Sequence, residues 1–206
     1  MMTKIKICGI TNMEDALAAV KLGADALGFV FYKESKRYIK PNVASEIARS
    51  LPPFVKKIGV FTNEDHGAIK DITGEVKLDL LQIHGDETPE YCNRLESPYI
   101  KAFRLRNEAT LSEINEYSTN YLLFDTYSKD EYGGTGHAFD WNLLKGKPFE
   151  NKYVILSGGL NPGNVGEAIS LLNPYAVDVS SGVEEFPGKK DIEKINKFIE
   201  AVKNGN

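Results

Sequence analysis

Residues 4–11 read Lys4-Ile5-Lys6-Ile7-Cys8-Gly9-Ile10-Thr11. The β-prone run up to Cys8 predicts a strand, Gly9 predicts a turn, and a helix signal follows at once. A strand that leads through a short turn into a helix is the first half of a βα unit. Its cysteine stands where the strand ends, which is where enzymes with parallel sheets carry reactive side chains.

Two interpretations of Cys8 are open on this segment alone. If it faces a cleft, its thiol can act as a nucleophile or a proton acceptor once it ionises. If it lies in the core, it is an inert buried cysteine, which is the commoner fate of a free cysteine. The rest of the chain favours the first interpretation.

The βα pattern repeats along the chain. Eight short apolar runs predict strands at residues 4–8, 26–31, 57–61, 80–84, 100–103, 122–125, 154–157 and 176–179. Amphipathic stretches between them predict helices that begin near Met13, Asn42, Asp65, Pro89, Leu111, Asp140, Pro162 and Asp191. Thr11 and Glu14 have the spacing of a capping box, and Asn161 precedes a proline suited to a first helical turn.

Repeated βα units predict a parallel sheet with right-handed crossovers. The competing architecture is an open doubly wound sheet, but the chain has no nucleotide-binding fingerprint. The glycine-rich loop at residues 132–137 lacks the third glycine and the helix of that motif, and its flexibility suits a lid. We therefore predict an α/β fold, a (β/α)8 TIM barrel that forms a single domain over residues 1–206.

Composition narrows the partners of this domain. The chain has 206 residues, of which 42% are hydrophobic and 26% charged, enough for one substantial core. The net charge of −4, without a polybasic run, argues against nucleic acid or an anionic membrane as a partner. Cys8 and Cys92 lie far apart, and neither a leader nor a membrane-spanning run precedes the first strand, so we expect a reduced, cytoplasmic protein.

Glycine-rich turns follow the last two predicted strands. They are Ser157-Gly158-Gly159 and Ser180-Ser181-Gly182. Glycines let backbone N–H groups approach an anion closely, and a following helix N-terminus adds a favourable dipole. Each turn alone is an ordinary tight turn, but the two together predict a phosphate site, because the loops after strands seven and eight of such barrels frequently form one.

Asp125 and Arg37 are further candidates for the site. Asp125 follows the apolar run 121–124, and poor solvation favours a protonated carboxyl suited to general acid catalysis, although a turn aspartate is an equal alternative. Cys8 and Asp125 come from well separated strands, so they could face each other across a bound sugar. Arg37 follows strand two, where a guanidinium can grip a carboxylate or phosphate, unless it is a solvated surface arginine.

Two residues are candidates for supporting roles. His84 ends strand four, either at the rim of the pocket or as a hydrogen-bonded core histidine, and we assign it no catalytic role. Asp178 lies near the predicted phosphate site, where a carboxylate would be repelled unless it turned away, so we expect structural support from it. The three histidines His66, His84 and His137 have no metal-ligand spacing, and we expect no metal.

Motifs with a common pattern run nearly from end to end of the chain. They are Lys6-Ile7-Cys8-Gly9-Ile10-Thr11, Gly28-Phe29-Val30-Phe31, Ser35-Lys36-Arg37-Tyr38-Ile39, Gly59-Val60-Phe61, Gln82-Ile83-His84-Gly85-Asp86-Glu87, Gly133-Gly134-Thr135-Gly136, Phe139-Asp140-Trp141, Leu156-Ser157-Gly158-Gly159-Leu160 and Asp178-Val179-Ser180-Ser181-Gly182-Val183-Glu184. Together they closely resemble the phosphoribosylanthranilate isomerase family of tryptophan biosynthesis. Ile83 replaces the family's usual leucine, which is a conservative change.

The resemblance implies an isomerase that uses no cofactor. Its reaction is the Amadori rearrangement of N-(5′-phosphoribosyl)anthranilate, a small phosphosugar, to 1-(o-carboxyphenylamino)-1-deoxyribulose 5-phosphate. By the family pattern Asp125 is the general acid, Cys8 is the general base, and Arg37 pairs with the anthranilate carboxylate. The phosphate would be held around Gly158, Gly159, Ser180, Ser181 and Gly182.

Three alternatives differ in features that the sequence displays. A pentose-phosphate epimerase would need a metal-ligand cluster. A histidine-pathway isomerase would favour two carboxylates over a cysteine as the acid–base pair. An inactive phosphosugar-binding barrel would have no need of Cys8 and Asp125.

The loop Leu51-Pro52-Pro53-Phe54 bears on assembly, since the sequence allows a monomer or a homodimer. It joins the second helix to the third strand, at the end of the barrel opposite the predicted site. A rigid diproline could hold Phe54 outward as an interface anchor. The alternative is a phenylalanine folded back onto the barrel floor.

Overall fold

The computed structural model describes residues 2–105, 109–126, 140–147 and 149–205. The loop predicted as a lid, at residues 132–137, lies outside these ranges, as do His137 and Phe139.

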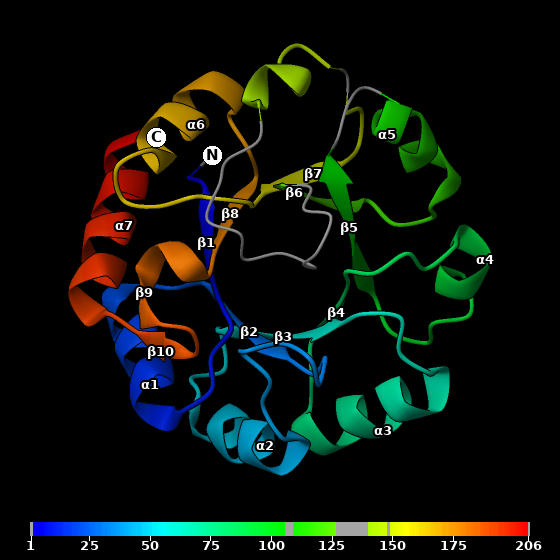
Figure 1. Cartoon of the computed structure of the whole chain (residues 1–206), viewed down its shortest axis with the longest axis vertical. Helices are drawn as coiled ribbons and strands as arrows, with labels where there is room; N and C mark the ends of the chain where they lie inside the picture. Colours follow the sequence, from blue (N-terminus) through cyan, green and yellow to red (C-terminus); the bar gives the residue numbers. More distant parts are fainter. Residues whose placement is uncertain (1, 106–108, 127–139, 148, 206) are drawn as a thin grey trace.

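Eight parallel strands close into a barrel, so the (β/α)8 prediction is confirmed and the open sheet is wrong (Figure 1). The strands are β1 (Lys4–Cys8), β2 (Ala26–Val30), β3 (Lys56–Phe61), β4 (Leu80–Ile83), β5 (Tyr99–Leu105), β6 (Tyr121–Thr126), β7 (Tyr153–Leu156) and β8 (Ala176–Val179). β8 pairs with β1 from Lys4↔Ala176 to Ile7↔Val179, which leaves the barrel without a sheet edge. Every predicted strand agrees with the observed one to within two residues.

Helices surround the barrel, as the outer ring in Figure 1 shows. They are α1 (Met13–Leu22), α2 (Pro41–Ser50), α3 (His66–Val76), α4 (Pro89–Cys92), α5 (Ala109–Ser112), α6 (Val165–Leu172) and α7 (Ile192–Gly205). Three 3₁₀ turns accompany them, η1 (Glu113–Glu116), η2 (Trp141–Leu143) and η3 (Ser181–Val183). The helix predicted near Asp140 is only the short turn η2 within the described residues.

The predicted start of α1 at Met13 is confirmed, but the predicted cap is wrong. The cap is Asn12 rather than Thr11, because the Asp15 N–H donates to Asn12 Oδ1 at 2.9 Å and Asn12 Nδ2 donates to Asp15 Oδ2 at 2.8 Å. α6 begins at Val165 rather than near Pro162. Asn161 uses its side-chain oxygen to accept from the Gly163 N–H at 2.8 Å, so it closes a turn before the helix.

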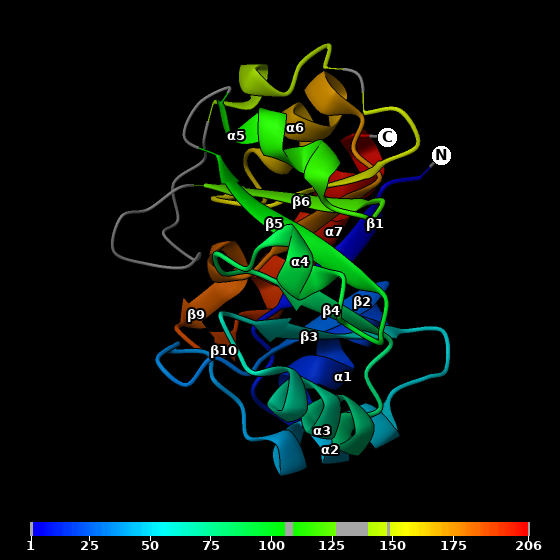
Figure 2. The same cartoon turned by 90° about the vertical axis from the view of Figure 1, so that its right-hand side faces the viewer.

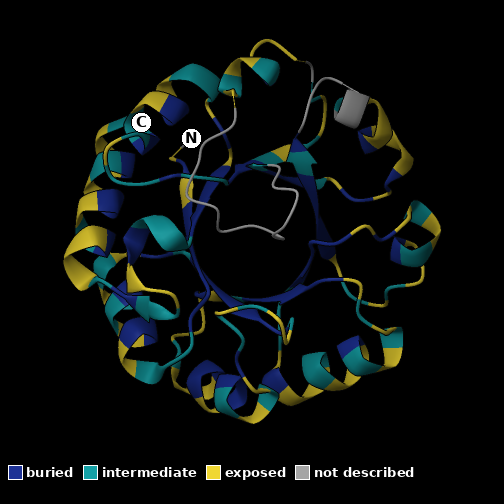
Figure 3. Cartoon of the chain, in the orientation of Figure 1, coloured by how far each residue is buried: buried dark blue, intermediate teal, exposed yellow. Residues whose placement is uncertain are grey.

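The strands present alternate residues to the helices and to the barrel interior. On β1, Ile5 and Ile7 pack in the apolar layer under the helices, while Lys6 and Cys8 point inward. Figure 3 shows the barrel wall as almost continuously buried. One interior apolar layer consists of Ala26, Ile58, Ile100, Ala102, Leu123, Ile155 and Ala176. The layer at the carboxyl ends of the strands contains Cys8 with Val30 and Val60.

A small hairpin after β8 is absent from the sequence prediction. Its strands β9 (Glu184–Phe186) and β10 (Lys189–Lys190) are antiparallel and too short to leave a periodic pattern. The hairpin is fastened to α1, since the Lys190 N–H donates to Asp15 Oδ2 at 2.7 Å and Lys189 Nζ donates to Asp15 Oδ1 at 2.8 Å. This fastening places Glu184 and Lys190 beside the end of β8.

The opposite end of the barrel carries an exposed aromatic residue and a cavity. Phe54, between α2 and β3, is 94% exposed, so the alternative in which it folds back onto the barrel floor is wrong. In Figure 2 its loop projects on the side away from β9 and β10. Beside it, a cavity of about 480 Å³ opens at the barrel floor, lined in part by Ile58, Leu80, Ile100 and Ala176. Within the described ranges, no helix has the length and apolarity needed to cross a membrane.

Candidate active site

A single pocket at the carboxyl ends of the strands collects nearly all the predicted site residues. Those that line it are Cys8, Arg37, His84, Asp125, Gly158, Gly159, Asp178, Ser180 and Ser181. Gly182 does not line the pocket but lies directly behind it, against the loop that follows β7. The barrel therefore brings together residues that are spread over most of the chain.

Cys8 is the last residue of β1, and only 7% of its surface is exposed. Gly9 turns the chain away with φ of +74°, a conformation that favours glycine. A Cβ atom on Gly9 would come within 2.8 Å of Arg37 Cδ and 2.9 Å of Ser180 Oγ. Only a residue without a side chain therefore lets the turn after β1 pack against Arg37 and Ser180. Burial raises the pKa of the Cys8 thiol, and the neighbouring Lys6 ammonium opposes that effect.

Asp125 lies on β6 with 4% of its surface exposed. Its Oδ1 accepts a hydrogen bond from the Thr126 N–H at 2.7 Å. Its Oδ2 lies 3.2 Å from His84 Nε2, in a geometry that makes no hydrogen bond. Gln82 lies 2.7 Å from the other ring nitrogen of His84, so the ring is fixed between the amide and the carboxyl. His84 is thus a buried residue of the pocket wall.

The two glycine-rich turns approach each other closely. Gly158 and Gly159 adopt φ of +80° and +67°, which side chains rarely tolerate. A Cβ on Gly158 would come within 2.7 Å of Asp125 Oδ1, and one on Gly182 would collide with the backbone oxygen of Leu160. The missing side chains therefore let the loop after β7 pack directly against Asp125 and against η3.

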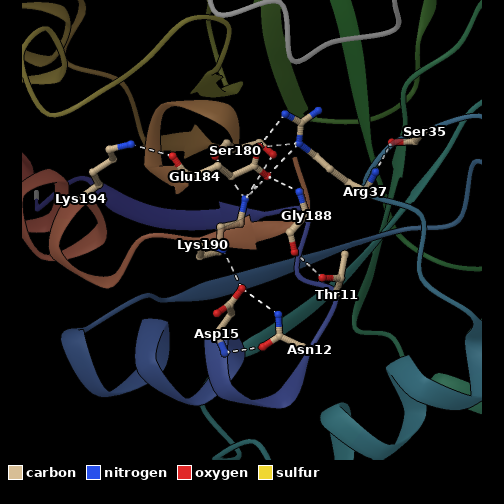
Figure 4. Close-up of polar contacts among 10 residues, drawn as sticks. All are labelled: Thr11, Asn12, Asp15, Ser35, Arg37, Ser180, Glu184, Gly188, Lys190 and Lys194. Carbon is tan, nitrogen blue, oxygen red and sulfur yellow. Dashed lines mark hydrogen bonds and ion pairs between the residues drawn. The ribbon is translucent and has the colours of Figure 1, made fainter. Parts of the chain in front are cut away.

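Arg37 belongs to a buried ionic cluster behind the pocket (Figure 4). Its Nε and Nη2 donate to the Glu184 carboxylate at 2.9 and 2.7 Å, in a bidentate pair. Lys190 Nζ donates to Glu184 Oε1 at 2.8 Å and to the Ser180 carbonyl at 3.2 Å. Burial alone would raise the pKa of Glu184, but Arg37 and Lys190 hold it below its ordinary value. Two cations thus share one carboxylate, and the cluster carries an excess positive charge.

Asp178 turns its carboxylate toward Lys6, which is on the adjacent strand. The two side chains form an ion pair of 2.9 Å, with 5% and 4% of their surfaces exposed. The pair lies inside the barrel beside Cys8. Because the Asp178 carboxylate is turned toward Lys6, an aspartate can lie near the predicted phosphate site, as expected from the sequence.

Sequence reasoning missed four residues that shape this site: Lys6, Gln82, Glu184 and Lys190. Lys6 and Gln82 stand at inward positions of predicted strands, two residues before Cys8 and His84, so strand periodicity could have placed them in the interior. Glu184 and Lys190 carry no such signal because they depend on the short hairpin. Among the described residues, no group of three His, Cys, Asp or Glu side chains is arranged to hold a metal ion.

A buried thiol and a buried carboxyl that share one pocket can work as a base and an acid on a molecule between them. Together with the closed barrel, this defines a class, the (β/α)8-barrel enzymes whose chemistry lies at the carboxyl ends of the strands. A family profile described as N-(5′phosphoribosyl)anthranilate (PRA) isomerase matches residues 5–201. The chain belongs to this family.

Individual relatives agree over nearly the whole length. The N-(5′-phosphoribosyl)anthranilate isomerase of Trichlorobacter lovleyi is 50% identical over 202 residues, covering 98% of each chain. A phosphoribosylanthranilate isomerase crystallised with reduced 1-(o-carboxyphenylamino)-1-deoxyribulose 5-phosphate has a TM-score of 0.88 and 46% identity, covering 98% of this chain and 100% of the other. Monomers generated from the dimeric enzyme of Thermotoga maritima give a TM-score of 0.87 and 44% identity, with the same coverage.

Proposed function

We propose that this chain isomerises N-(5′-phosphoribosyl)anthranilate to 1-(o-carboxyphenylamino)-1-deoxyribulose 5-phosphate in tryptophan biosynthesis, with Asp125 as general acid and Cys8 as general base. The observation that carries these roles is that the two groups are buried in one pocket, although they stand on β1 and β6. A related isomerase binds a reduced form of this product, which is consistent with the same ligand here.

Asp125 acts first in the proposed mechanism. Its carboxyl proton passes to the furanose ring oxygen, the bond between that oxygen and C1′ breaks, and the anthranilate nitrogen supplies the electron pair that makes a protonated Schiff base. Only 4% of Asp125 is exposed, so its carboxyl is held at the pocket rather than in solvent. Its hydrogen bond from Thr126 leaves Oδ2 as the oxygen that faces His84 and the pocket.

Cys8 completes the rearrangement. As a thiolate it removes the C2′ proton, and the electrons of that C–H bond move toward the positively charged nitrogen to give an enolamine. The enolamine becomes the ketone when its hydroxyl proton is lost and C1′ gains a proton. A thiol that has taken up the proton can return it later in the cycle, which suits a base that must be regenerated.

The substrate's two anionic groups bind to different residues of the pocket wall. Arg37 pairs with the anthranilate carboxylate, which offsets the excess positive charge of the cluster formed with Glu184 and Lys190. The phosphate binds at the glycine-rich turns around Gly158, Gly159, Ser180, Ser181 and Gly182, where bare backbone can approach it. No cofactor or metal takes part in the proposed mechanism.

Residues 1–206 act as one domain in the cytoplasm. The matched family region, residues 5–201, and the barrel strands span almost all of the chain. Cys8 and Cys92 are both free thiols. A reducing compartment keeps a cysteine base in the form that can accept a proton.

The functional molecule is a homodimer joined through the barrel floors. Phe54 is 94% exposed beside a floor cavity of about 480 Å³, so one face carries both a projecting ring and a recess. A cavity of about 150 Å³ is already enough for benzene. A face with both features can pair with its own copy about a two-fold axis, each ring entering the other's cavity.

Substrate fluorescence tests the catalytic proposal. Freshly generated N-(5′-phosphoribosyl)anthranilate is mixed with the wild type, Cys8→Ala or Asp125→Asn, in the presence of a chelator. We expect rapid loss of anthranilate fluorescence with the wild type, and turnover lower by a factor of about 10² or more in each variant, since acid and base act in the transition state.

Binding of the reduced product separates catalysis from recognition. Both variants should bind 1-(o-carboxyphenylamino)-1-deoxyribulose 5-phosphate in its reduced form within a few-fold of the wild type. If a variant loses binding but keeps its turnover, its assigned role is wrong. If the chelator abolishes wild-type activity, the metal-free mechanism is wrong.

A further inference from the structure

Lys6 and Asp178 form an ion pair that the proposed mechanism does not use. Their charged atoms are 2.9 Å apart, and both residues are at least 95% buried. Removing two charges from water costs several kcal/mol per ion, which the attraction between them repays only in part. Such a pair in the interior of the barrel calls for a functional explanation.

The ammonium group lies beside the sulfur of Cys8. Lys6 and Cys8 are two residues apart on β1, so both project into the barrel interior from the same face of the strand. The neighbouring strand carries Gly28 opposite Cys8. A Cβ on Gly28 would come within 2.7 Å of Cys8 Sγ and 3.0 Å of Lys6 Nζ, so the sulfur and the ammonium share the space left by the missing side chain.

We propose that Lys6 and Asp178 are positioning residues that act on Cys8 in opposite directions, the Lys6 ammonium serving as the counter-charge of the Cys8 thiolate and Asp178 holding that ammonium and limiting its effect. The inference rests on the proposed role of Cys8 as the base. Removal of the C2′ proton requires a thiolate in a poorly solvated pocket, and the Lys6 ammonium held by Asp178 stabilises that thiolate.

The surrounding charges support this division of roles. Close to Cys8 lie Lys6 on β1, Asp178 on β8 and Lys190 on β10; Arg37, His84 and Asp125 line the same pocket. Burial raises the pKa of Cys8 most, Lys6 lowers it, Asp178 raises it, and Lys190 lowers it. Burial alone would lower the pKa of Lys6, but Asp178 and Cys8 hold it above its ordinary value, so Lys6 remains an ammonium.

The test is the pH dependence of Cys8 alkylation by iodoacetamide, which reports the thiolate without any need for turnover. The rate is followed by mass spectrometry of the Cys8 peptide in the wild type, Lys6→Met and Asp178→Asn. We expect Lys6→Met to move the midpoint of the profile upward by about 1 pH unit or more, because the Asp178 carboxylate then acts on the sulfur without the Lys6 ammonium between the two charges. Asp178→Asn should move it downward, because the ammonium is left to the thiolate.

Two controls accompany these variants. Lys4→Met makes the same chemical change two residues earlier on β1, where the lysine pairs with Asp25 and its side chain is 50% exposed, and it should leave the profile unchanged. Cys92 serves as an internal reference in every sample, because its pKa, raised to about 11 by burial, responds to Lys101 and Glu87 rather than to Lys6. Its alkylation should be the same in all variants.

The opposite signs keep the proposal falsifiable even if a single variant unfolds. The double variant Lys6→Met with Asp178→Asn removes both charges, and its midpoint should lie between those of Lys6→Met and Asp178→Asn. Shifts of the same sign in the two single variants, or no shift in either, would overturn the proposal. Because alkylation needs no substrate, opposite shifts in a protein that fails to isomerise would sustain the charge effect and reject the isomerase assignment instead.

Discussion

Arg37 owes its orientation to a residue far along the chain. Its bidentate partner Glu184 is 147 positions away and comes from a hairpin with no sequence signature. The motif around Arg37 therefore indicated an anion-binding residue, but neither segment alone could indicate the pair. The same holds for Lys6, whose partner Asp178 is 172 positions away. Residue types were predictable at this scale, whereas contacts between distant segments were not.

Arg37→Ala and Glu184→Gln should both raise KM, the first more than the second. Arg37→Ala removes a charged hydrogen-bond donor to the carboxylate, and we expect KM to rise about 10-fold or more, with a smaller fall in kcat from misorientation. Glu184→Gln retains the size of the side chain but loses the bidentate grip on Arg37. It should raise KM less than Arg37→Ala, with kcat within a few-fold of the wild type. Steady-state kinetics by fluorescence measures both constants.

Glu185→Gln is the matched control for Glu184→Gln. Glu185 is the next residue on β9, it is exposed, and the same substitution there should leave KM unchanged. An equal effect of the two substitutions would mean that Glu184 acts through general charge rather than through Arg37. A loss in kcat alone would place Glu184 in the chemical step, contrary to its position behind the guanidinium.

At the scale of the elements, the turn η3 packs against the loop that follows β7 because Gly182 has no side chain. Gly182 in η3 packs against the Leu160 carbonyl of the loop that follows β7. Gly182→Ala would press a Cβ onto that oxygen, so the two loops must separate. We expect KM for the phosphorylated substrate to rise about 10-fold and competitive inhibition by inorganic phosphate to weaken, as steady-state kinetics would show.

Gly74→Ala provides the matched control for Gly182→Ala. Gly74 lies in the last turn of α3, and a Cβ there would meet nothing within 4 Å. The substitution should leave KM and phosphate inhibition unchanged, and it should raise the free energy of unfolding by about 0.5–1 kcal/mol in urea titrations, because alanine favours the helix. If Gly182→Ala binds phosphate as well as Gly74→Ala does, the loops after β7 and β8 do not form the phosphate site.

Strands were more predictable than helix starts for a physical reason. The barrel strands are mostly buried on both faces, and most of them read as apolar runs, which a sequence displays directly. A helix start depends on which side-chain oxygen caps it, and Asn161 and Thr11 had suitable side chains without being caps. The turn η2 and the hairpin of β9 and β10 are too short to show any periodicity.

At the scale of the whole molecule, the two ends of the barrel have separate tasks. Phe54→Asp places a charge on the floor face, and we expect sedimentation to report a monomer where the wild type is a dimer. Turnover should persist, because the pocket lies at the other end of the barrel. Phe186→Asp is the control, since Phe186 is also exposed, at 58%, but lies on β9, beside the pocket. It should leave the mass unchanged.

A wild type that already sediments as a monomer would reject the dimer. If the Phe54→Asp variant still sediments as a dimer, Phe54 is not the anchor of the dimer interface. The sequence predicted the outward Phe54 only as one of two alternatives, because the direction of a loop side chain depends on the packing beneath it. The cavity at the barrel floor is lined by residues of several strands, so no single stretch of sequence could indicate it.

The direct pairing of β1 with β8 has a consequence for synthesis. Among the barrel strands, β1 leaves the ribosome first and its neighbour β8 last, so the barrel stays open, with two unpaired strand edges, until all eight strands have been made. Cys8 receives Lys6 from its own strand but Asp178 and Lys190 only after β8 and β10 have been made. A nascent or truncated chain therefore carries a cysteine without its charged surroundings, and the environment of the base is completed in the same event that closes the fold.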